Sequence, residues 1–405
     1  MFAMPGPLDG VRVLDLATML AGPVAAMMLA DQGADVIKIE PPGGELMRHF
    51  SERRGGMSAF FLSCNRNKRS LAVDLKTPQG LEILRKLIAG AAVIVHNFRP
   101  GVADRIGLGE DAVRAIRPDI IYVSITGYGE HGPYAGMRAY DPVIQALSGL
   151  AEVQRDADTG RPRMIRTIVA DYTTALTAAQ AITAALFSRE RTGEGQHVRI
   201  AMLDAIISYH WPETMQNLVF VGNERDPSEG EIGPDLVFAT QDRYITVSAL
   251  SNDEWAGLCR ALKREDLIDD SRFRTPRDRY INGAERRQIT TTELEKWRAD
   301  EILPRLQAND VPSAPVLTRV EMLKEPQVRE NRIVEEHQSD LFGKIRHARP
   351  AAQFDRTPAG IRQLAPMLGA HNAELLGELG YSDAEIAQLE NDRVIGSKII
   401  GSSNE

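Results

Sequence analysis

Residues 11–40 read VRVLDLATMLAGPVAAMMLADQGADVIKIE, a pattern that indicates a strand, a helix and a second strand. The run VRVLDLA at 11–17 is short and apolar, as expected for a strand buried in a parallel sheet. Gly22 and Pro23 open a helix, whose first turn tolerates proline, and ADVIKIE at 34–40 is the next strand. Two parallel strands joined through a helix form a βαβ unit.

The same alternation continues along the first half of the chain. Thr77 and Pro78 form an N-cap and first-turn pair that opens one of the later helices. Further strands are expected at 70–75, 92–98, 119–129 and 196–202, and helices at 78–90, 111–117, 141–151 and 171–189. Such spacing predicts an α/β fold with a doubly wound, mostly parallel, Rossmann-like sheet covered by helices on both faces.

A chain of 405 residues exceeds the size at which one hydrophobic core usually keeps growing, so two domains are expected. A polar segment rich in turn formers, GNERDPSEGEIGPD, suggests the linker between them. Near the C-terminus, Ser382 and Glu385 have the spacing of a capping box in a helical tail at 370–390. The expected parts are a large domain, a linker, a smaller α+β domain, and a return linker with the rest of the large domain: 1–221, 222–235, 236–325 and 326–405.

Composition and charge exclude several classes of partner. Charged residues make up 26% of the chain and hydrophobic residues 43%, as in a globular protein. A net charge of −8 argues against nucleic acid or an anionic membrane as the main partner. Two cysteines, Cys64 and Cys259, are too few for a disulfide framework or a zinc site. With no signal-like start and no long apolar run, we expect a cytoplasmic protein.

Most standard catalytic motifs are absent. The turn TMLAGPVAA has one glycine, which does not support a dinucleotide site of the G-x-G-x-x-G type. The chain also lacks a P-loop, an H-E-x-x-H helix and a G-x-S-x-G elbow, and its eight histidines are scattered. A lone histidine such as His210 is more often structural than a ligand.

One carboxylate stands out. The stretch TIVADYTTALTAAQAITAAL at 167–186 has only Asp171 and Tyr172 as ionisable side chains. Asp171 could be an N-cap that follows a β-branched run at 167–169, a role worth roughly 1 kcal/mol. It could instead be a partly desolvated nucleophile where a strand gives way to a mostly apolar helix. The residues alone leave both interpretations open.

Several segments together resemble one family. They are LDLATMLAGPVAAMMLADQGADVIKIEPP, NRNKRSLAVDLKTPQG, VIVHNFRPGVADRIGL, AYDPVIQALSGL, RERTGEGQHVRIAMLDA, VPSAPVLTRVEMLKEPQV and PMLGAHNAELLGELGYS. In this order they are similar to the class III coenzyme A transferases, which include formyl-CoA and carnitine CoA-transferases and the α-methylacyl-CoA racemases. The resemblance covers nearly the whole chain. It implies a small second domain, chain ends in the large domain, and an interlinked homodimer.

The resemblance identifies Asp171 as the nucleophile. It implies transfer of coenzyme A (CoA) between an acyl-CoA and a free carboxylic acid through an aspartyl-CoA thioester. CoA would be a substrate, and no permanently bound cofactor or metal is expected. In this interpretation capping geometry supports the nucleophilic carboxylate, because helix N–H groups stabilise its charge.

The resemblance also implies CoA-binding residues after the strand ends, where an open α/β sheet binds ligands. They are Leu20, Ala21, Val73, Asp74, Leu75, Lys76, Asn97, Phe98, Arg99, Arg105, Arg138, Ala139, Tyr140 and Asp141. Structural alternatives exist for some of them. Val73 and Phe98 could be core, Asn97 could be a turn former, and Arg105 and Arg138 could be solvated surface charges.

Two departures from the family pattern affect the site. Some relatives have a run of glycines that closes over the intermediate, whereas this chain has only the spaced Gly222, Gly230 and Gly233. Pro41 stands where relatives often have a basic residue. The glycines of RTGEG, Gly193 and Gly195, are expected to end a helix rather than contact a ligand.

Three functions remain open at this stage. An intermolecular CoA-transferase fits the sequence best. An α-methylacyl-CoA racemase is the alternative, although the racemases use a histidine where this chain has Tyr140 before Asp141. A CoA-binding protein without turnover is the third, and the presence of Asp171 counts against it.

Overall fold

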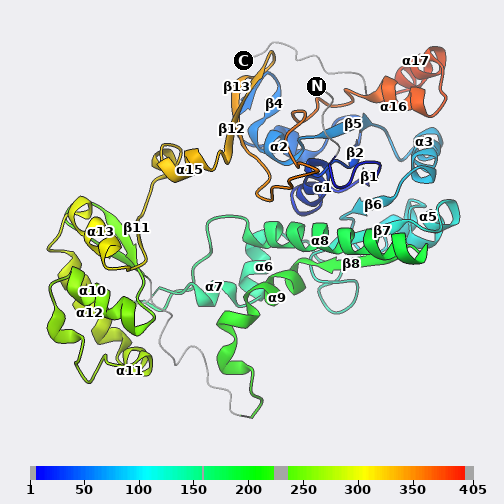
Figure 1. The fold of residues 1–405 in the computed structure, drawn as a ribbon. Helices are drawn as coiled ribbons and strands as arrows, with labels where there is room; N and C mark the ends of the chain where they lie inside the picture. The colour runs from blue at the N-terminus through cyan, green and yellow to red at the C-terminus, as the bar shows by residue number, and fades with distance from the viewer. Residues whose placement is uncertain (1–5, 157–158, 223–235, 397–405) are drawn as a thin grey trace. The chain divides into compact units, whose positions relative to one another are not determined.

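The computed structural model describes residues 6–156, 159–222 and 236–396, and Figure 1 shows its secondary structure elements. The chain divides into two compact units. The first unit comprises Met1–Arg225 and Ile333–Glu405, and the second comprises Asp226–Arg332. Apart from Gly222, the expected linker 222–235 lies outside the described residues.

A six-stranded parallel sheet forms the centre of the first unit. Its strand order is β5-β2-β1-β6-β7-β8. The strands are β1 (Arg12–Asp15), β2 (Asp35–Glu40), β5 (Lys68–Ala72), β6 (Val93–His96), β7 (Ile121–Thr126) and β8 (His197–Ala201). Each strand lies within or overlaps a strand expected from the sequence. The chain runs outward from β1 in one direction and from β6 in the other, which makes the β1/β6 boundary the topological switch point.

Helices cover both faces of this sheet. Val13 of β1 belongs to a core formed with α1 (Ala21–Asp31) and α8 (Val169–Thr192), whereas the adjacent Leu14 faces the opposite core. That second core contains α3 (Pro78–Ala89), α5 (Glu110–Ile116), α16 (Asn372–Glu378) and α17 (Asp383–Asn391). Alternate strand residues therefore enter two separate cores, as a doubly wound sheet requires.

Local sequence signals determine several helix ends. The Thr77 side chain accepts a hydrogen bond from Gly80 N–H at the start of α3, and Ser382 and Glu385 form the expected capping box on α17. Gly193 ends α8 in a left-handed conformation with φ 75°, which confirms its predicted role as a helix terminator.

Two predictions about the middle of the chain are wrong. Residues 167–168 are not a strand, because the chain enters α8 directly at Val169. The expected helix at 141–151 is divided into α6 (Asp141–Leu147) and α7 (Leu150–Val153). Gly149, between them, has φ 85°, a conformation that interrupts a right-handed helix.

The first unit is completed by short elements around the sheet. They are η1 (Leu46–His49), β3 (Arg53–Arg54), β4 (Met57–Ser58), α2 (Ala59–Cys64), α4 (Val102–Arg105), α9 (Met202–Thr214), η2 (Gln216–Leu218), β12 (Val334–Ser339) and β13 (Gly343–Ala348). β3 pairs with β4, and β12 with β13, each in an antiparallel hairpin.

The second unit is a small α+β assembly with its own core. Its antiparallel sheet has the order β11-β10-β9. The elements are β9 (Val237–Ala239), β10 (Tyr244–Val247), α10 (Asn252–Ala261), η4 (Glu265–Leu267), α11 (Pro276–Ile281), α12 (Gly283–Leu294), α13 (Ala299–Ala308), β11 (Ser313–Pro315), α14 (Arg319–Met322) and α15 (Pro326–Glu330). Trp255 and Phe273 pack in this core with ring centroids 5.5 Å apart.

Candidate active site

Asp171 lies in the first turn of α8, which begins at Val169. The residue before the helix, Ile168, provides no side-chain cap. Instead, the backbone N–H groups of Ala170 and Asp171 donate to Oδ2 of Asp141, at 2.6 and 3.3 Å. The prediction that Asp171 is the N-cap is therefore wrong. A buried carboxylate from α6 accepts those N–H donors, which leaves the Asp171 side chain available for other partners.

The environment of Asp171 makes its carboxylate unusually basic. Burial raises its pKa from 3.8 to about 6, and the charge of Asp141 contributes to the rise. A hydrogen bond from the backbone N–H of Ala21, the first residue of α1, works in the opposite direction. A carboxylate with this pKa is mostly ionised at pH 7, yet it is a stronger base than an exposed aspartate. These properties suit a nucleophile.

Two other ionisable groups lie near enough to Asp171 to interact with its charge. Burial raises the pKa of the Cys64 thiol to about 11, and the Asp171 charge contributes. Burial also raises the pKa of the Tyr172 phenol, with contributions from Cys64 and Asp171. Both groups therefore remain protonated at neutral pH, and Asp171 is the nucleophile that this environment favours.

Asn97 connects the two loops at the topological switch point. The backbone N–H of Thr18 donates to Asn97 Oδ1 at 2.9 Å, and Asn97 Nδ2 donates to the carbonyl oxygen of Thr18 at 2.7 Å. Leu20, which is buried, and Ala21 follow in the same loop and begin α1. These three expected CoA-binding residues lie at the carboxyl ends of β1 and β6, and their contact with CoA stays a prediction.

The expected residues 73–76 follow β5 at the same edge of the sheet. Val73 is buried and forms a β-bridge with Ile395. Asp74 N–H donates to the carbonyl oxygen of Val394 at 2.7 Å. Leu75 is partly buried in the second core, whereas Lys76 is exposed. The structural interpretation of Val73 as a core residue is confirmed, and Lys76 is the cation of this group that a phosphate can reach.

The remaining expected residues differ in exposure. Phe98 stacks on His96 with ring centroids 5.0 Å apart, while Arg99, Arg105 and Arg138 are exposed. Ala139 is half-buried and Tyr140 is exposed, directly before the buried Asp141. Of the predicted set, Ala21 and Asp141 interact with Asp171.

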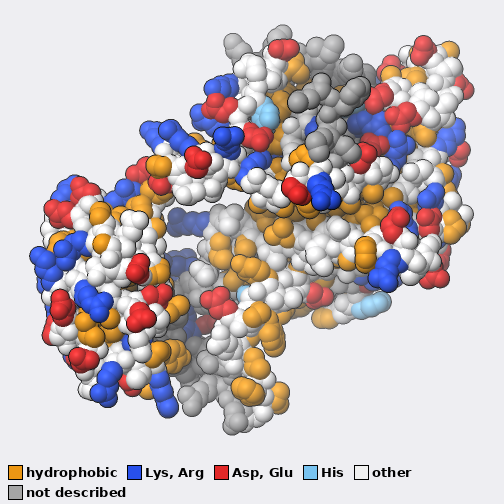
Figure 2. Space-filling view, viewed as in Figure 1, with side chains coloured by type: hydrophobic (Ala, Val, Ile, Leu, Met, Phe, Trp, Pro, Cys, Tyr) orange, Lys and Arg blue, Asp and Glu red, His pale blue; other side chains and the backbone are white. Residues whose placement is uncertain are grey.

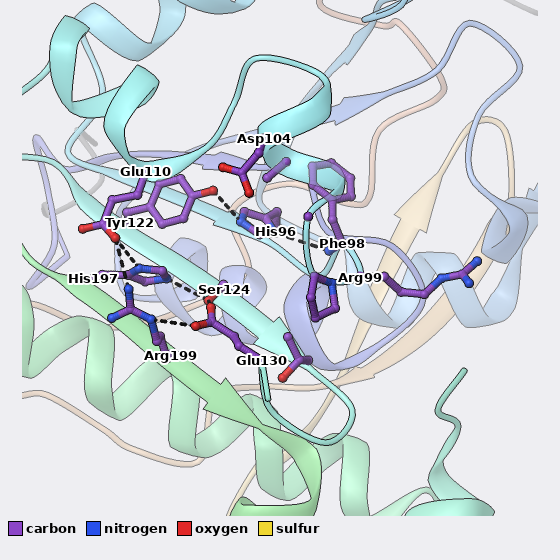
Figure 3. A pocket seen from close by; sticks show the side chains of 14 residues that line it. His96, Phe98, Arg99, Asp104, Glu110, Tyr122, Ser124, Glu130, His197 and Arg199 are labelled. Atoms are coloured by element: carbon purple, nitrogen blue, oxygen red, sulfur yellow. Dashed lines mark hydrogen bonds and ion pairs between the residues drawn. The ribbon is translucent and has the colours of Figure 1, made fainter. Parts of the chain in front are cut away.

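A cavity of about 310 Å³ lies against β6, β7 and β8, between the sheet and the loop 98–104 (Figure 3). Tyr122 OH donates to the carbonyl oxygen of Leu108 at 2.9 Å and lies 2.8 Å from His96 Nε2. Phe98 N–H donates to His96 Nδ1, so the proton of the neutral ring is on Nε2. Burial, with the charge of His197, lowers the pKa of His96 to about 4, and His96 is neutral at pH 7.

The same cavity is lined by a serine, a histidine and a glutamate joined by hydrogen bonds (Figure 3), and the His197 ring lies edge-on to Tyr122 with centroids 4.8 Å apart. Ser124 Oγ lies 2.8 Å from His197 Nε2, and His197 Nδ1 lies 2.6 Å from Glu110 Oε2. Arg199 forms ion pairs with Glu110 and Glu130. Ser124 lies inside β7, whose N–H groups are used by strands on both sides, so the strand offers no oxyanion donors. This arrangement supports the wall of the cavity rather than a second nucleophile.

A group of buried charges that was not predicted from the sequence lies beneath the loop after β1. Asp15, Lys38, Glu45 and Lys68 are almost completely buried, and they contact one another and the backbone of this loop. Two of them interrupt apolar strands, Asp15 in VRVLDLA and Lys38 in ADVIKIE. A charge inside a buried strand was the available signal, because it needs a partner.

The described residues include no cluster of three or more side chains suited to hold a metal ion. None of the helices in the described ranges has the length and apolar character needed to cross a membrane.

Comparison with known proteins gives consistent matches over most of the chain. The sequence model of CoA-transferase family III matches residues 8–372. Succinate–glutarate CoA-transferase of Agrobacterium fabrum is 35% identical over 389 residues, which cover 92% of this chain and 96% of that protein. Human succinyl-CoA:glutarate CoA-transferase is also 35% identical, with 96% of this chain and 90% of that protein covered. The crystal structure of Rv3272 from Mycobacterium tuberculosis aligns with a TM-score of 0.81 at 33% identity, covering 92% of this chain and 99% of the other.

Proposed function

We propose a function for this chain from the premise that it belongs to CoA-transferase family III and is an enzyme of that class. The proposed reaction moves CoA from an acyl-CoA to a free carboxylic acid through a thioester on Asp171. The observation that carries the proposal is the Asp171 carboxylate itself, which is partly buried, has a pKa near 6 and faces the N–H group that begins α1.

The first half of the reaction transfers CoA to the enzyme. A carboxylate oxygen of Asp171 bonds to the thioester carbonyl carbon, the C–S bond breaks, and CoA leaves as a thiolate. The thiolate then attacks the Asp171 carbonyl of the mixed anhydride, and the donor acid leaves as a carboxylate. Partial burial favours the first step because the attacking oxygen has little hydration to lose.

The second half reverses these steps with the acceptor. Its carboxylate attacks the aspartyl thioester, and the released thiolate then takes the acyl group of the new anhydride. In each step an anionic nucleophile attacks and an anionic leaving group departs, so no net proton transfer is needed. The N–H group at the start of α1 supplies positive potential for the charges that develop.

We infer that the substrates are short dicarboxylic acids and their CoA thioesters. Two relatives at 35% identity are named for succinate or succinyl-CoA and for glutarate. Exposed cations at the carboxyl edge of the sheet, Lys76, Arg99 and Arg105, support binding of the phosphates of CoA. Arg138, exposed shortly before α6, is a further candidate cation.

The proposal is tested by exchange between succinyl-CoA and glutarate. Wild-type protein should form glutaryl-CoA and succinate, and Asp171→Asn should not, while keeping its fold. Asp253→Asn is the matched control, because it changes an exposed carboxylate in the first turn of another helix, α10. An Asp171→Asn variant with more than a few per cent of wild-type turnover would rule out the covalent role. Monocarboxylic acids accepted as readily as glutarate would refute the inferred substrate class.

The homodimer expected from the sequence has support in exposed hydrophobic side chains. Leu176 and Phe187 of α8 are 60% and 64% exposed, and Tyr209 of α9 is 62% exposed. Hydrophobic side chains gather over this part of the surface in Figure 2. We propose that a second copy of the chain covers them, since large apolar side chains grouped on one face are typical of an interface. Sedimentation should give a dimer at nanomolar concentration, and a monomer would contradict this.

A further inference from the structure

The loop from β1 to α1 is held from below by side chains on three neighbouring strands. Asp15 of β1 pairs in register with Lys38 of β2, and Lys68 begins β5. Lys38 Nζ donates to the carbonyl oxygen of Ala17, and Lys68 Nζ donates to that of Pro23 at 2.8 Å. One carbonyl of the loop and one of the first turn of α1 therefore accept hydrogen bonds from buried ammonium groups.

These charges are compensated within the protein. Asp15, Lys38 and Lys68 have no solvent exposure. Burial opposes ionisation of Asp15, but Lys38 and Lys68 hold its pKa below the ordinary value. Burial likewise opposes the charge of Lys38, but Asp15 and Glu45 raise its pKa. Burial acts the other way on the remaining two groups, because it lowers the pKa of Lys68 and raises the pKa of Glu45. The loop is thus supported by buried, paired side chains rather than by solvated ones.

Glu45 holds the middle of the loop. Its Oε2 accepts the backbone N–H of Met19 at 2.8 Å, and its Oε1 lies 3.1 Å from Lys38 Nζ. Glu45 is 3% exposed, and its own backbone N–H donates to Glu40 Oε1 at 3.1 Å. Arg48 in turn binds Glu40 through two hydrogen bonds of 2.8 and 2.6 Å. The acceptor for Met19 therefore has little freedom to move.

Met19 adopts a conformation that needs such an acceptor. Its φ is 66°, in the left-handed region that costs a non-glycine residue about 1 kcal/mol or more. Strain of this kind persists only where surrounding contacts impose it. The N–H bond to Glu45 and the two Asn97 bonds to Thr18 are the described contacts that fix the backbone at this point.

The strained residue lies two positions before Ala21. The Ala21 N–H is the backbone donor that the Asp171 carboxylate accepts. A relaxed Met19 would rotate the following peptide groups and move this donor away from Asp171. The other charges and ionisable groups that interact with Asp171 are Asp141, Cys64 and Tyr172. Cys64 belongs to the same buried core as Leu20 and Ala21, and the Glu45 charge also raises the pKa of its thiol.

We propose that Glu45 is a positioning residue for the transfer reaction: through Met19 it fixes the backbone donor of Ala21 against the Asp171 carboxylate. This inference rests on the proposed function, because it concerns the efficiency of the same nucleophile. Glu45 acts through the backbone and does not touch the substrate.

Three substitutions separate the effect of the side-chain length of Glu45 from the effect of its charge. Glu45→Gln keeps an oxygen at the same distance and loses the charge. Glu45→Asp keeps the charge but is one carbon shorter, and Glu45→Ala loses both. Leu389→Ala is the control, because it weakens the core on the opposite face of the sheet. The measurement is the single-turnover rate of aspartyl adduct formation with succinyl-CoA between pH 5 and 8, together with thermal unfolding.

We expect Glu45→Ala and Glu45→Asp to slow adduct formation about tenfold or more, and Glu45→Gln to keep most of the rate. The acid midpoint, which is the pH at which the rate of adduct formation falls to half of its maximum, should be higher in the Ala and Asp variants. The reason is that Asp171 loses an N–H donor that stabilises its charge. Loss of the negative charge of Glu45 alone would lower the acid midpoint, so the Glu45→Gln variant should not have a higher midpoint than wild type. Leu389→Ala should leave the midpoint unchanged.

An Asp variant at least as active as the Gln variant, or Ala and Asp midpoints equal to wild type, would overturn the proposal. If Glu45→Ala does not fold, the ranking of Gln over Asp still decides the question. Wild-type protein that forms no adduct would instead refute the proposed function, so the two failures are distinguishable.

Discussion

The carboxylate of Asp141 accepts the backbone N–H of Asp171, and its negative charge raises the pKa of the Asp171 side chain. One aspartate thus stabilises the start of the helix that carries the other and at the same time makes the other more basic. The cap of α8 and the proposed nucleophile are therefore two different residues, 30 positions apart in the sequence.

The first prediction concerns this pair. Asp141→Asn removes the charge, so the pKa of Asp171 should fall and the acid midpoint of adduct formation should move below pH 6. The amide also cannot accept from both the helix and Gln145 as the carboxylate does, which should cost about 1–3 kcal/mol of stability. Rate profiles and thermal melts measure the two effects, with the exposed Glu390→Gln as the control. A midpoint that stays in place or rises would show that Asp141 does not act on Asp171 electrostatically.

A second prediction is that the proposed nucleophile destabilises the fold. Because the pKa of Asp171 is about 6 in the folded protein, the folded state binds its proton more tightly than the unfolded chain does. Stability attributable to this group therefore falls as pH rises from about 4 to 6. The Asp171→Asn substitution should raise the free energy of unfolding by about 1–3 kcal/mol at pH 7.5 and change it little at pH 4. Chemical denaturation at both pH values measures this, and equal gains would contradict the burial argument.

The third prediction concerns the phosphates of CoA. Arg105→Ala and Arg138→Ala should raise KM for succinyl-CoA much more than they lower kcat, because contacts far from the reacting carbonyl contribute uniform binding. Arg329→Ala, an exposed arginine of α15, serves as the control. Steady-state kinetics over a range of succinyl-CoA concentrations provide the measurement. Unchanged KM in both variants would remove these arginines from the CoA site.

The fourth prediction separates the transferase from the racemase. Racemisation needs a base and an acid on opposite faces of the α-carbon, and a tyrosine such as Tyr140 ionises too weakly near pH 7 to replace histidine well. The groups that act on Asp171 include no histidine. A 2-methylacyl-CoA incubated with the protein in D₂O without an acceptor acid should gain no α-deuterium, as read by mass spectrometry. Rapid deuteration would favour the racemase, with Asp171 as a base.

The strands of the large unit could be predicted because each is a short apolar run between turn formers. The start of α8 could not be predicted in the same way. Its N–H groups are taken by Asp141, which lies far away in the sequence, and no local pattern reveals a cap supplied from another helix. The division of the helix at 141–151 depended on whether Gly149 takes a positive φ, which composition alone does not determine.

The sequence suggested the main parts of the candidate site, but it did not suggest the buried residues beneath the loop after β1. The sequence suggested Asp171 and the loops after β1 and β6. It did not suggest Glu45, because that residue follows β2 in a loop with no chemical motif. Its contact with the loop depends on the fold, in which β1 and β2 pair in parallel, Lys38 lies beside Asp15, and the Glu45 carboxylate accepts the backbone N–H of Met19.

The covalent adduct on Asp171 is the most direct test of the account. Wild-type protein is mixed with succinyl-CoA without acceptor, treated with hydroxylamine and digested with trypsin. Cleavage after Arg166 and Arg189 gives a peptide in which Asp171 is the only carboxylate side chain. The account predicts a hydroxamate on this peptide, absent without succinyl-CoA and absent in Asp171→Asn. If wild-type protein catalyses CoA exchange while this peptide stays unmodified, the covalent role of Asp171 is contradicted.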